Sequence, residues 1–313
     1  MRVAMTGASG LIGTALSRDL AADGHAVLRL VRRPARSPDE HEWDPAAAAG
    51  GIDRAVLRGV DAVVHLAGAP IAAGRWTPAR KKVLAQSRIQ ATRALVAAMT
   101  AADQGPRVLL SGSAIGWYGD TGDAIVDESA PNGTGFLAGL VRDWEAAARS
   151  AASAGIRVAT LRTGVVLAPG GGMLSRLVLP FRLGLGARIG SGQQYLSWIS
   201  LTDHVRATRF LLGEQAIDGP VNLTAPNPVT NAQFTAELAR VLRRPAVLRL
   251  PAAALRAALG EVASELLASA RVLPRKLTDA GFVFAEPDIG QALAAAIGGV
   301  PGTRQAGQPG AGR

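Results

Sequence analysis

The chain opens with residues 1–33, MRVAMTGASGLIGTALSRDLAADGHAVLRLVRR, and this stretch sets the architecture expected for the rest. Val3 to Met5 form a short apolar run, Thr6-Gly7 interrupts it, and apolar residues then recur with helical spacing from Leu11 to Leu20. This pattern predicts a strand, a glycine turn and a helix at the start of the chain.

The turn contains three glycines, Gly7, Gly10 and Gly13, with the spacing GxxGxxG. In dinucleotide-binding folds such glycines allow a tight turn, a close approach of the backbone to a pyrophosphate, and packing of the helix on the strand. The amide groups and partial positive charge at the helix N-terminus then face the phosphates. We therefore predict a dinucleotide-binding fold, with a purely structural glycine turn as the alternative.

The second predicted strand, Ala26 to Val31, ends at Arg32-Arg33. An NAD-specific site normally has an Asp or Glu there to bind the ribose hydroxyls, whereas forked guanidinium donors match the oxygens of a 2′-phosphate. The doublet therefore favours NADP(H) over NAD(H). The alternative is a pair of solvated arginines after a structural turn.

Strand and helix patterns continue to alternate as far as Thr163. Strands are expected at residues 61–66, 108–110 and 156–161, and helices at 77–100 and 136–154. Repeated alternation with short connections predicts an α/β fold of the Rossmann type, with a doubly wound parallel sheet.

Glycine- and proline-rich segments follow Thr163, with further helices expected at 231–242 and 252–267. They indicate a smaller lid beside the sheet. We expect residues 1–165 to form the NADP-binding Rossmann domain, 196–225 to return to it, 166–298 to form the substrate-side domain, and 299–313 to be a disordered tail, because its apolar content is too low to pack.

The composition is that of a folded globular protein, since 48% of the 313 residues are hydrophobic. The absence of cysteine excludes disulfides and thiolate chemistry, and the four histidines lack the spacing of metal ligands. The formal charge is +10, but the arginines are dispersed and aromatic residues are few, so an anionic nucleotide explains the charge better than a nucleic-acid partner. With no signal peptide or membrane-spanning stretch, we expect a cytoplasmic protein, monomeric or homodimeric, without a membrane partner.

Several blocks of sequence resemble the extended short-chain dehydrogenase/reductases, namely TGASGLIG, HLAGAP, SRIQATR and SGSAIGWYGD. Further blocks, including RWTPARKKVLAQSRIQATR, DWEAAA, LRTGVVLAPGGG, GSGQQYLSWI and LPRKLTDAGFVF, are similar to family 39U of these proteins, the predicted nucleoside-diphosphate-sugar epimerases of the NAD-dependent epimerase/dehydratase family. The resemblance covers about Met1 to Ile297. It implies NADP(H) as cofactor and a small-molecule substrate that could be a sugar nucleotide.

The resemblance also assigns cofactor contacts. It implies that the glycine loop holds the pyrophosphate, that Arg32 and Arg33 hold the 2′-phosphate, and that Leu66-Ala67-Gly68 lines the adenosine side. Arg88 and Val166 would lie nearer the ribose and nicotinamide, and Ser113 falls where the family has its active-site Ser or Thr. The loop residues implied are Gly7, Ala8, Ser9, Gly10, Leu11, Ile12 and Gly13.

The chain departs from the wider superfamily at the Tyr-x-x-x-Lys pair, in which a lysine lowers the pKa of a catalytic tyrosine. Tyr118 and Tyr195 are the two tyrosines, and the residues four positions later are Gly122 and Ile199. The predicted proton donor is therefore Tyr118, five residues after Ser113, with water as the alternative. Ser113 and Tyr118 could instead be a satisfied hydroxyl and a pocket wall, and Arg88 could supply the positive charge of the missing lysine.

Four further residues are candidates for substrate contacts. Arg75, Trp76 and Trp198 could face the pocket, although buried tryptophans more often belong to a core. Arg182, with glycines nearby in PFRLGLG, could meet an anionic substrate group, or could be a surface arginine beside a turn.

These features lead to two main hypotheses and one weaker alternative. The first is an NADP(H)-dependent oxidoreductase or epimerase-like enzyme acting on a small substrate. The second, prompted by the missing Tyr-Lys pair, is a non-catalytic NADP(H)-binding sensor or regulatory protein. A nucleic-acid binder rests on charge alone.

Overall fold

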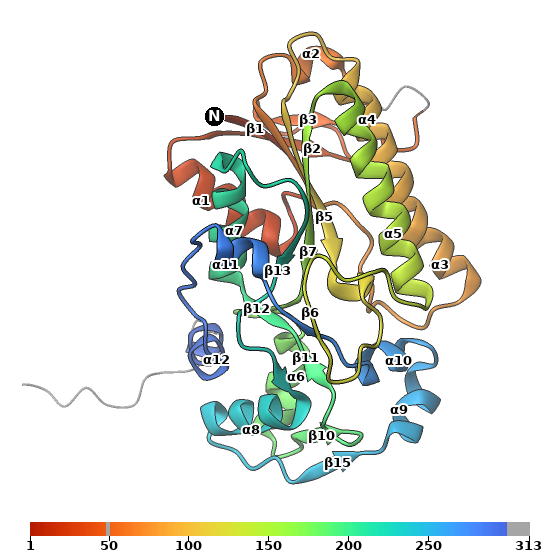
Figure 1. Cartoon of the computed structure of the whole chain (residues 1–313), viewed down its shortest axis with the longest axis vertical. Helices are drawn as coiled ribbons and strands as arrows, with labels where there is room; N and C mark the ends of the chain where they lie inside the picture. The colour runs from red at the N-terminus through yellow and green to blue at the C-terminus, as the bar shows by residue number, and fades with distance from the viewer. Residues whose placement is uncertain (48–50, 299–313) are drawn as a thin grey trace, which may run out of the picture.

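The computed structural model describes residues 1–47 and 51–298, and at its centre lies a seven-stranded, fully parallel sheet (Figure 1). The strand order is β13-β7-β5-β4-β1-β2-β3, so the direction of winding reverses between β1 and β4. This confirms the predicted α/β fold with a doubly wound parallel sheet. The strands are β1 (Arg2–Thr6), β2 (Ala26–Val31), β3 (Glu40–Glu42), β4 (Ala62–His65), β5 (Val108–Ala114), β7 (Arg157–Thr163) and β13 (Gly219–Leu223).

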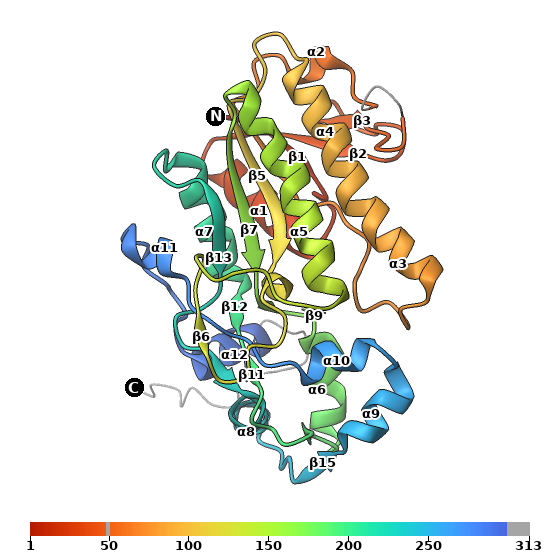
Figure 2. The same cartoon turned by 45° about the vertical axis from the view of Figure 1, so that its right-hand side comes forward.

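Helices cover both faces of the sheet (Figures 1 and 2). On one face, α1 (Leu11–Ala22) and α7 (Leu201–Gly213) share a buried apolar cluster with Val3 and Met5 of β1. On the other face, α4 (Ala91–Thr100) and α5 (Phe136–Arg149) share a cluster with Ala4. Successive side chains of a strand point to opposite faces, so a strand covered on both sides is apolar throughout.

The helix predicted over residues 77–100 is present but is not uniform. It begins as α3 (Pro78–Ala85), where the Thr77 side chain accepts a hydrogen bond from the Arg80 amide, as expected of an N-cap. A π-helical turn, Gln86–Gln90, then separates α3 from α4. Such turns insert an extra residue into the helix and are frequent at functional sites.

A second lobe lies beyond the lower end of the sheet, with its own apolar core that includes Leu174, Trp198, Phe234 and Leu293 (Figure 2). The helix predicted at 252–267 is broken in two by Gly260, whose φ is +62°. The longer elements of this lobe are β8 (Val165–Ala168), α6 (Leu174–Arg182), β10 (Ala187–Ile189), β12 (Trp198–Ser200), α8 (Asn231–Leu242), β15 (Leu248–Leu250), α9 (Ala252–Leu259), α10 (Val262–Leu267) and α12 (Ile289–Gly298). Its short pieces are β9 (Gly171–Gly172), β11 (Tyr195–Leu196), β14 (Val229–Thr230) and β16 (Arg271–Val272). The short helix α11 (Arg275–Asp279) lies against β13 of the sheet, while α2 (Arg54–Leu57) and β6 (Ile125–Val126) lie in earlier loops.

The chain returns from this lobe to the sheet through α7 and β13, both of which lie within the predicted return at 196–225. The division of the chain into domains stays a prediction. The expected disorder of residues 299–313 concerns a segment outside the described residues. Within residues 1–47 and 51–298, no helix has the length and apolar character needed to cross a membrane.

Candidate functional site

The glycine turn between β1 and α1 lies at the carboxyl edge of the sheet, where the winding reverses. Gly7 has a φ of +70°, and a Cβ on it would come within 2.7 Å of the Leu66 carbonyl carbon. A Cβ on Gly13 would come within 2.2 Å of the Gly7 carbonyl oxygen. Gly10 is the N-cap of α1 and provides no side chain to bind the first amides. The turn therefore presents bare backbone and an uncapped helix N-terminus at the reversal point, which is where open α/β sheets bind ligands.

The segment after β4 lies directly against this turn. The Ala67 amide donates a hydrogen bond to Thr6 Oγ1 at 3.3 Å, and Gly7 is close to the Leu66 backbone. A Cβ on Gly172 would lie 3.2 Å from the Val166 carbonyl oxygen and 3.6 Å from the Leu11 side chain. The structure thus gathers the glycine loop, the 66–67 segment and the strand that carries Val166 at one edge of the sheet.

A buried chain of hydrogen bonds connects the 66–67 segment, through Thr6 and His65, to the helices behind it. The Thr92 hydroxyl donates to the Arg88 carbonyl at 2.7 Å, so its oxygen accepts from Trp144 Nε1 and from His65 Nε2, both at 3.0 Å. His65 therefore carries its hydrogen on Nε2, and its Nδ1 accepts from the Thr6 hydroxyl at 2.6 Å. Burial, together with the charge of Arg88, lowers the pKa of His65 to about 4, so the ring is neutral at pH 7.

Arg88, in the π-helical turn, is 8% exposed. Its guanidinium donates to the Ala69 carbonyl at 3.0 Å, lies against Gly68 and faces the ring of Trp144. No carboxylate among the described residues pairs with it, and burial, with a smaller effect of Arg80, lowers its pKa to about 10. A desolvated cation without a counter-ion is costly unless an anion binds beside it, which makes Arg88 a candidate ligand contact.

The two arginines that end β2 differ in their surroundings. Arg32 is exposed, and none of the described residues accepts a hydrogen bond from its guanidinium. Arg33 donates from Nη1 and Nη2 to the two oxygens of Glu40, at 2.8 and 2.7 Å. These bonds hold the pKa of Glu40 below its usual range.

Ser113 belongs to a polar row that crosses three adjacent strands. Ser113 of β5, Arg162 of β7 and Asn222 of β13 are partners in the strand registers. From α5, the fully buried Glu145 reaches this row, where Oε1 accepts from Ser113 Oγ at 2.6 Å and from Arg162 Nε at 2.8 Å. Because a carboxylate can only accept, the hydrogen of Ser113 is committed to Glu145 and its oxygen is left to accept from elsewhere.

Tyr118 closes the same row from the loop after β5. Its hydroxyl donates to Asn222 Oδ1 at 2.7 Å and accepts from Arg162 Nη1 at 3.0 Å. Burial raises the pKa of Tyr118 to about 12. Ser113 and Tyr118, which was predicted from its place five residues after Ser113, are thus connected through Glu145 and Arg162. The Arg162 guanidinium also stacks 4.0 Å from the centre of the Trp117 ring.

The N-terminal half of α5 places apolar side chains against Gly116, three residues after Ser113. A Cβ on Gly116 would lie 3.3 Å from Leu137 Cβ and 3.9 Å from a methyl group of Val141. These are the two positions, four residues apart, at which a Tyr-Lys pair would stand in one register of the sequence.

Residues 3–223 match the family model described as "NAD dependent epimerase/dehydratase family". An epimerase family protein of Mycobacterium tuberculosis is 51% identical over 93% of this chain and 96% of its own length. The chain belongs to the NAD-dependent epimerase/dehydratase family. Residues 250–296 also match a domain of unknown function, DUF1731.

Two solved structures of this fold are particularly similar. The human epimerase family protein SDR39U1, crystallised with NADPH, has a TM-score of 0.86 and 36% identity, covering 95% of this chain and 99% of that one. A protein described as a nucleoside-diphosphate sugar epimerase from Corynebacterium glutamicum has a TM-score of 0.78 and 35% identity, covering 95% of this chain but 58% of that one. These similarities confirm the resemblance to the SDR39U1 group of the epimerase family.

The residues present fit the dinucleotide that the family name implies. The space a side chain would fill at Gly7 and Gly13 is taken by backbone, so the loop can stay close to the sheet and offer its amides. The uncapped end of α1 has no acidic residue in its first turn to compete with phosphate. Just after β2, Arg32 provides a guanidinium that has no acceptor among the described residues.

Three of the four substrate candidates have partners within the protein, and Arg182 is the exception among the described residues. Arg75 donates to the Ala257 and Ala258 carbonyls at the end of α9, and Trp76 donates to the Ile71 carbonyl while its ring meets Phe136 edge-on. Trp198 is fully buried in the core of the second lobe. Arg182 lines a cavity of about 260 Å³ beside α6, and its buried Nη2 has no partner among the described residues. Their roles toward a substrate stay predictions.

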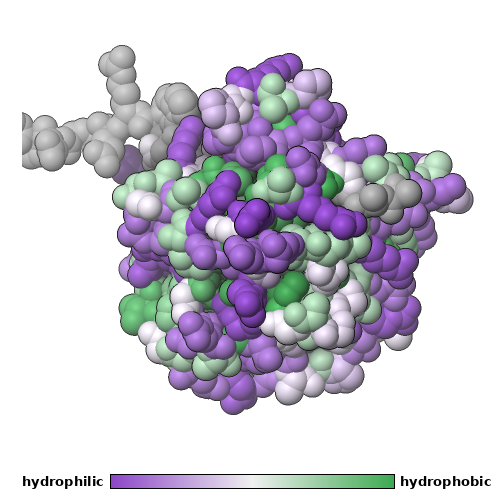
Figure 3. Space-filling model, turned by 90° about the horizontal axis from the view of Figure 1, so that it is seen from above, coloured by the Kyte–Doolittle hydropathy of each residue, from purple (hydrophilic) through white to green (hydrophobic). Residues whose placement is uncertain are grey.

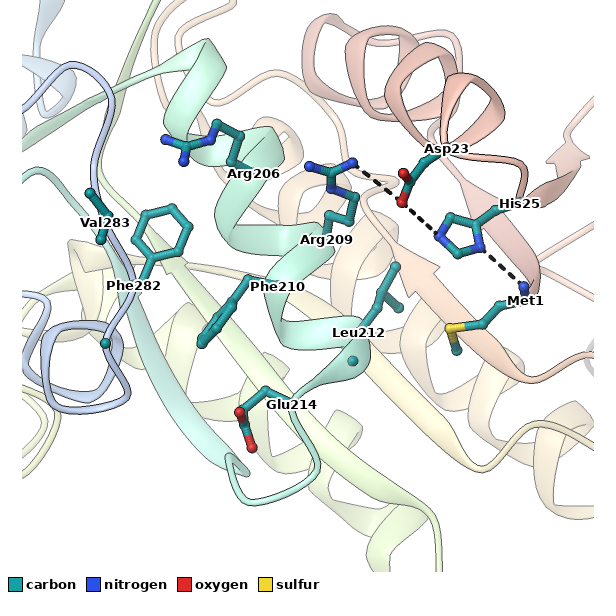
Figure 4. A pocket seen from close by; sticks show the side chains of 12 residues that line it. Met1, Asp23, His25, Arg206, Arg209, Phe210, Leu212, Glu214, Phe282 and Val283 are labelled. Atoms are coloured by element: carbon teal, nitrogen blue, oxygen red, sulfur yellow. Dashed lines mark hydrogen bonds and ion pairs between the residues drawn. The ribbon is translucent and has the colours of Figure 1, made fainter.

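A larger cavity, of about 540 Å³, lies away from the glycine loop (Figure 4). Met1 and His25, at the starts of β1 and β2, line it, so it opens near the amino edge of the sheet. Figure 3 views the molecule from that end, where hydrophilic and hydrophobic residues are interspersed. Arg209 in this cavity is already paired with Asp23 at 3.3 Å.

Several residues of the site were not predicted from the sequence, and the charged ones that matter most are Glu40, Glu145 and Arg162. Glu145 could have been noticed because it stands on the apolar face of an otherwise amphipathic helix, where a charge requires a partner. Arg162 similarly ends an apolar strand pattern. Nothing near Glu40 in the sequence points to Arg33 as its partner.

Proposed function

We propose that this protein binds NADP(H) at the carboxyl edge of its sheet and catalyses hydride transfer on a small, nucleotide-linked substrate, as an oxidoreductase or epimerase. The observation that supports this most is the uncapped glycine turn at the point where the winding reverses. Beside it, just after the neighbouring β2, Arg32 has no partner within residues 1–47 and 51–298. The NADPH in the human SDR39U1 crystals supports the choice of cofactor. The name of the Corynebacterium protein supports a nucleoside-diphosphate sugar as the first substrate class to test.

The cofactor, when bound, supplies a hydride acceptor or donor at its nicotinamide ring. We propose that the loop amides and α1 hold its pyrophosphate, that the 66–68 segment lines the adenosine side, and that Arg88 and Val166 lie near the ribose and nicotinamide. The proposed cofactor residues are Gly7, Ala8, Ser9, Gly10, Leu11, Ile12, Gly13, Arg32, Arg33, Leu66, Ala67, Gly68, Arg88 and Val166.

Ser113 is proposed to touch the substrate at the carboxyl edge. Since its hydrogen is donated to Glu145, its oxygen would accept a hydrogen bond from a substrate hydroxyl. Glu145 acts as a positioning residue, held by Arg162 at 2.8 and 3.0 Å. This arrangement favours recognition of an alcohol over a carbonyl.

Tyr118 was predicted as the proton donor, with water as the alternative. A phenol with a pKa of about 12 that already donates to Asn222 holds its proton firmly near neutral pH, which favours water as the donor and a positioning role for Tyr118. Ser113 and Tyr118 both remain in the proposal, and a single variant at each position separates their roles.

Calorimetry with NADPH and NADP⁺ tests cofactor binding, and single-turnover absorbance with a panel of UDP-sugars tests chemistry. We expect Ser113→Ala to bind NADPH within about threefold of the wild type while slowing hydride transfer by about 100-fold, the usual scale of a lost hydrogen bond to a reacting group. Tyr118→Phe should slow it by about tenfold or less if water is the donor. No heat with either nucleotide would remove the proposal.

A second function, an NADP(H)-binding protein without turnover, is favoured by one observation. The hydrogen of Ser113 is committed to Glu145, and the apolar Leu137 and Val141, which lie against Gly116, occupy the positions of the Tyr-Lys pair in one register of the sequence. Tight NADPH binding with no nicotinamide oxidation or reduction across the sugar-nucleotide panel would support this function over the first.

A further inference from the structure

Arg32 and Arg33 look equivalent in the sequence, but only Arg33 forms an ion pair with Glu40. Glu40 is the first residue of β3 and is 6% exposed. Its Oε2 accepts from Arg33 Nη1 at 2.8 Å and from the Arg36 amide at 2.9 Å, while its Oε1 accepts from Arg33 Nη2 at 2.7 Å. Arg33 Nη1 also donates to the Pro34 carbonyl at 3.0 Å. Both terminal nitrogens of the Arg33 guanidinium therefore already donate hydrogen bonds within the protein.

The charges follow the same division. Glu40 balances the positive charge of Arg33, and Arg29 Nη1 also lies 3.7 Å from Oε1 of Glu40. Arg32 is exposed and has no acceptor or carboxylate among the described residues. A dianionic phosphate is attracted by the uncompensated guanidinium and only weakly by the neutral pair.

Glu40 also brings an acidic group close to the end of β2. In NAD-specific sheets of this type an acidic residue near that place binds the ribose hydroxyls and repels a 2′-phosphate. Here the carboxylate is covered by Arg33 and by the Arg36 amide, so it cannot act in that way.

We propose that Arg32 alone contacts the 2′-phosphate, and that Arg33 acts on cofactor choice indirectly, by neutralising and covering Glu40. This inference rests on the proposed NADP(H) binding. It assigns the preference for NADP(H) over NAD(H) to Arg32 and to the covering of the Glu40 carboxylate by Arg33.

The first experiment measures binding by calorimetry with four probes, NADPH, NADH, 2′,5′-ADP and 5′-AMP. Arg32→Met keeps the apolar stem and removes the charge. We expect it to weaken NADPH and 2′,5′-ADP by at least about tenfold, the scale of a lost charged hydrogen bond, and to leave NADH and 5′-AMP within about twofold. NADPH binding equal to that of the wild type would overturn the assignment of Arg32. Arg36→Met, another exposed arginine of the same loop, is the matched control and should change no ratio.

The second experiment is a double-variant cycle at Arg33 and Glu40. Arg33→Met should weaken NADPH about tenfold because it uncovers the Glu40 charge, and adding Glu40→Gln should restore NADPH binding to within about threefold of the wild type. If Arg33 held the phosphate directly, the double variant would bind NADPH as weakly as Arg33→Met, and the inference would be overturned. An Arg33→Met variant with unchanged affinity would overturn it too.

Thermal melts of each variant establish that the loop change leaves the fold intact. Glu40→Gln alone keeps the shape of the side chain and serves as the reference for the cycle. The two proposals fail differently, since a wild type that binds neither NADPH nor NADH removes the proposed function, whereas a wild type that binds NADPH with the wrong variant pattern removes only this inference.

Discussion

At the scale of single residues, the polar row around Ser113 depends on buried charged side chains that are paired with each other. Glu145 is fully buried, and its carboxylate is paired with two arginines that differ in solvent exposure. Arg162 is 2% exposed and forms two hydrogen bonds with it, while Arg149 lies one helical turn away with 44% of its side chain exposed. Equal formal charges on the same partner should therefore contribute very differently to stability.

Arg162→Met should lower the free energy of unfolding by about 3–5 kcal/mol, because it leaves a buried carboxylate without its main partner. Arg149→Met, the matched control, should cost less than about 1 kcal/mol, since its pair with Glu145 is screened by solvent. Urea unfolding at pH 7 measures both. Similar losses for the two variants would contradict this account of the row.

The residues that could be predicted from sequence are those whose function depends on local spacing. The glycines follow a three-residue period between a strand and a helix, and Arg32-Arg33 directly follow a strand, so their placement needs only the chain near them. Glu145 and Arg162 depend on the order of strands in the sheet, because Arg162 meets Ser113 only when β5 and β7 are neighbours in register. The distinction between Arg32 and Arg33 depends on a side-chain pairing across a loop, which no periodic pattern encodes.

At the scale of elements, the start of α1 shows how a helix can require a glycine. Alanine normally stabilises a helix relative to glycine. In α1, however, a Cβ on Gly13 would lie 2.2 Å from the Gly7 carbonyl oxygen, whereas Gly139 in α5 has no atom within 4 Å of a built Cβ. Glycine at position 13 therefore lowers the helix propensity of α1 but allows the glycine turn to pack closely against the helix.

The same substitution should thus have opposite effects in the two helices. Gly139→Ala should stabilise the protein by about 0.5–1 kcal/mol, as at an open helical site. Gly13→Ala should destabilise it by about 1–3 kcal/mol because the turn must move, and should weaken NADPH binding as well. Denaturant unfolding and calorimetry measure the two effects. A Gly13→Ala variant as stable as Gly139→Ala would show that the turn is free to move.

Helix boundaries mark a limit of prediction at this scale. The helix at 77–100 was predicted from a cap and a period, but its π-helical turn was not, because one extra residue in the ladder leaves the apolar pattern almost unchanged. The turn matters for the site, since it carries Arg88. Gly260 similarly divides α9 from α10, and a lone glycine in a helical pattern is often tolerated, so the break was missed.

At the scale of the whole molecule, two fully buried histidines tie stability to pH. The pKa of His65 is lowered to about 4 by burial and by the Arg88 charge, and burial lowers that of His204 to about 4 as well. Both lie below the value of about 6.5 in an unfolded chain. The unfolded state therefore binds more protons between these values, and stability falls as the pH drops.

We expect the free energy of unfolding to decrease by up to about 3 kcal/mol per histidine between pH 6.5 and pH 4. Urea unfolding at intervals over this range measures the slope. His65→Gln, which removes one of the two groups, should reduce the slope by about half while lowering stability at pH 7. An unchanged slope in that variant would mean that His65 does not take up a proton on unfolding.

The polar row across β5, β7 and β13 also has a consequence for synthesis. Tyr118 and Asn222, which complete the row, lie 104 residues apart in the chain, and α5, β7, the first part of the second lobe and α7 lie between them. A ribosome adds about 5–20 residues per second, so the nascent phenol waits roughly 5–20 s for its acceptor to be made. From the completion of β7 until β13 is made, the edge of the sheet beside β7 stays open, and this exposed strand edge is what a chaperone has to shield.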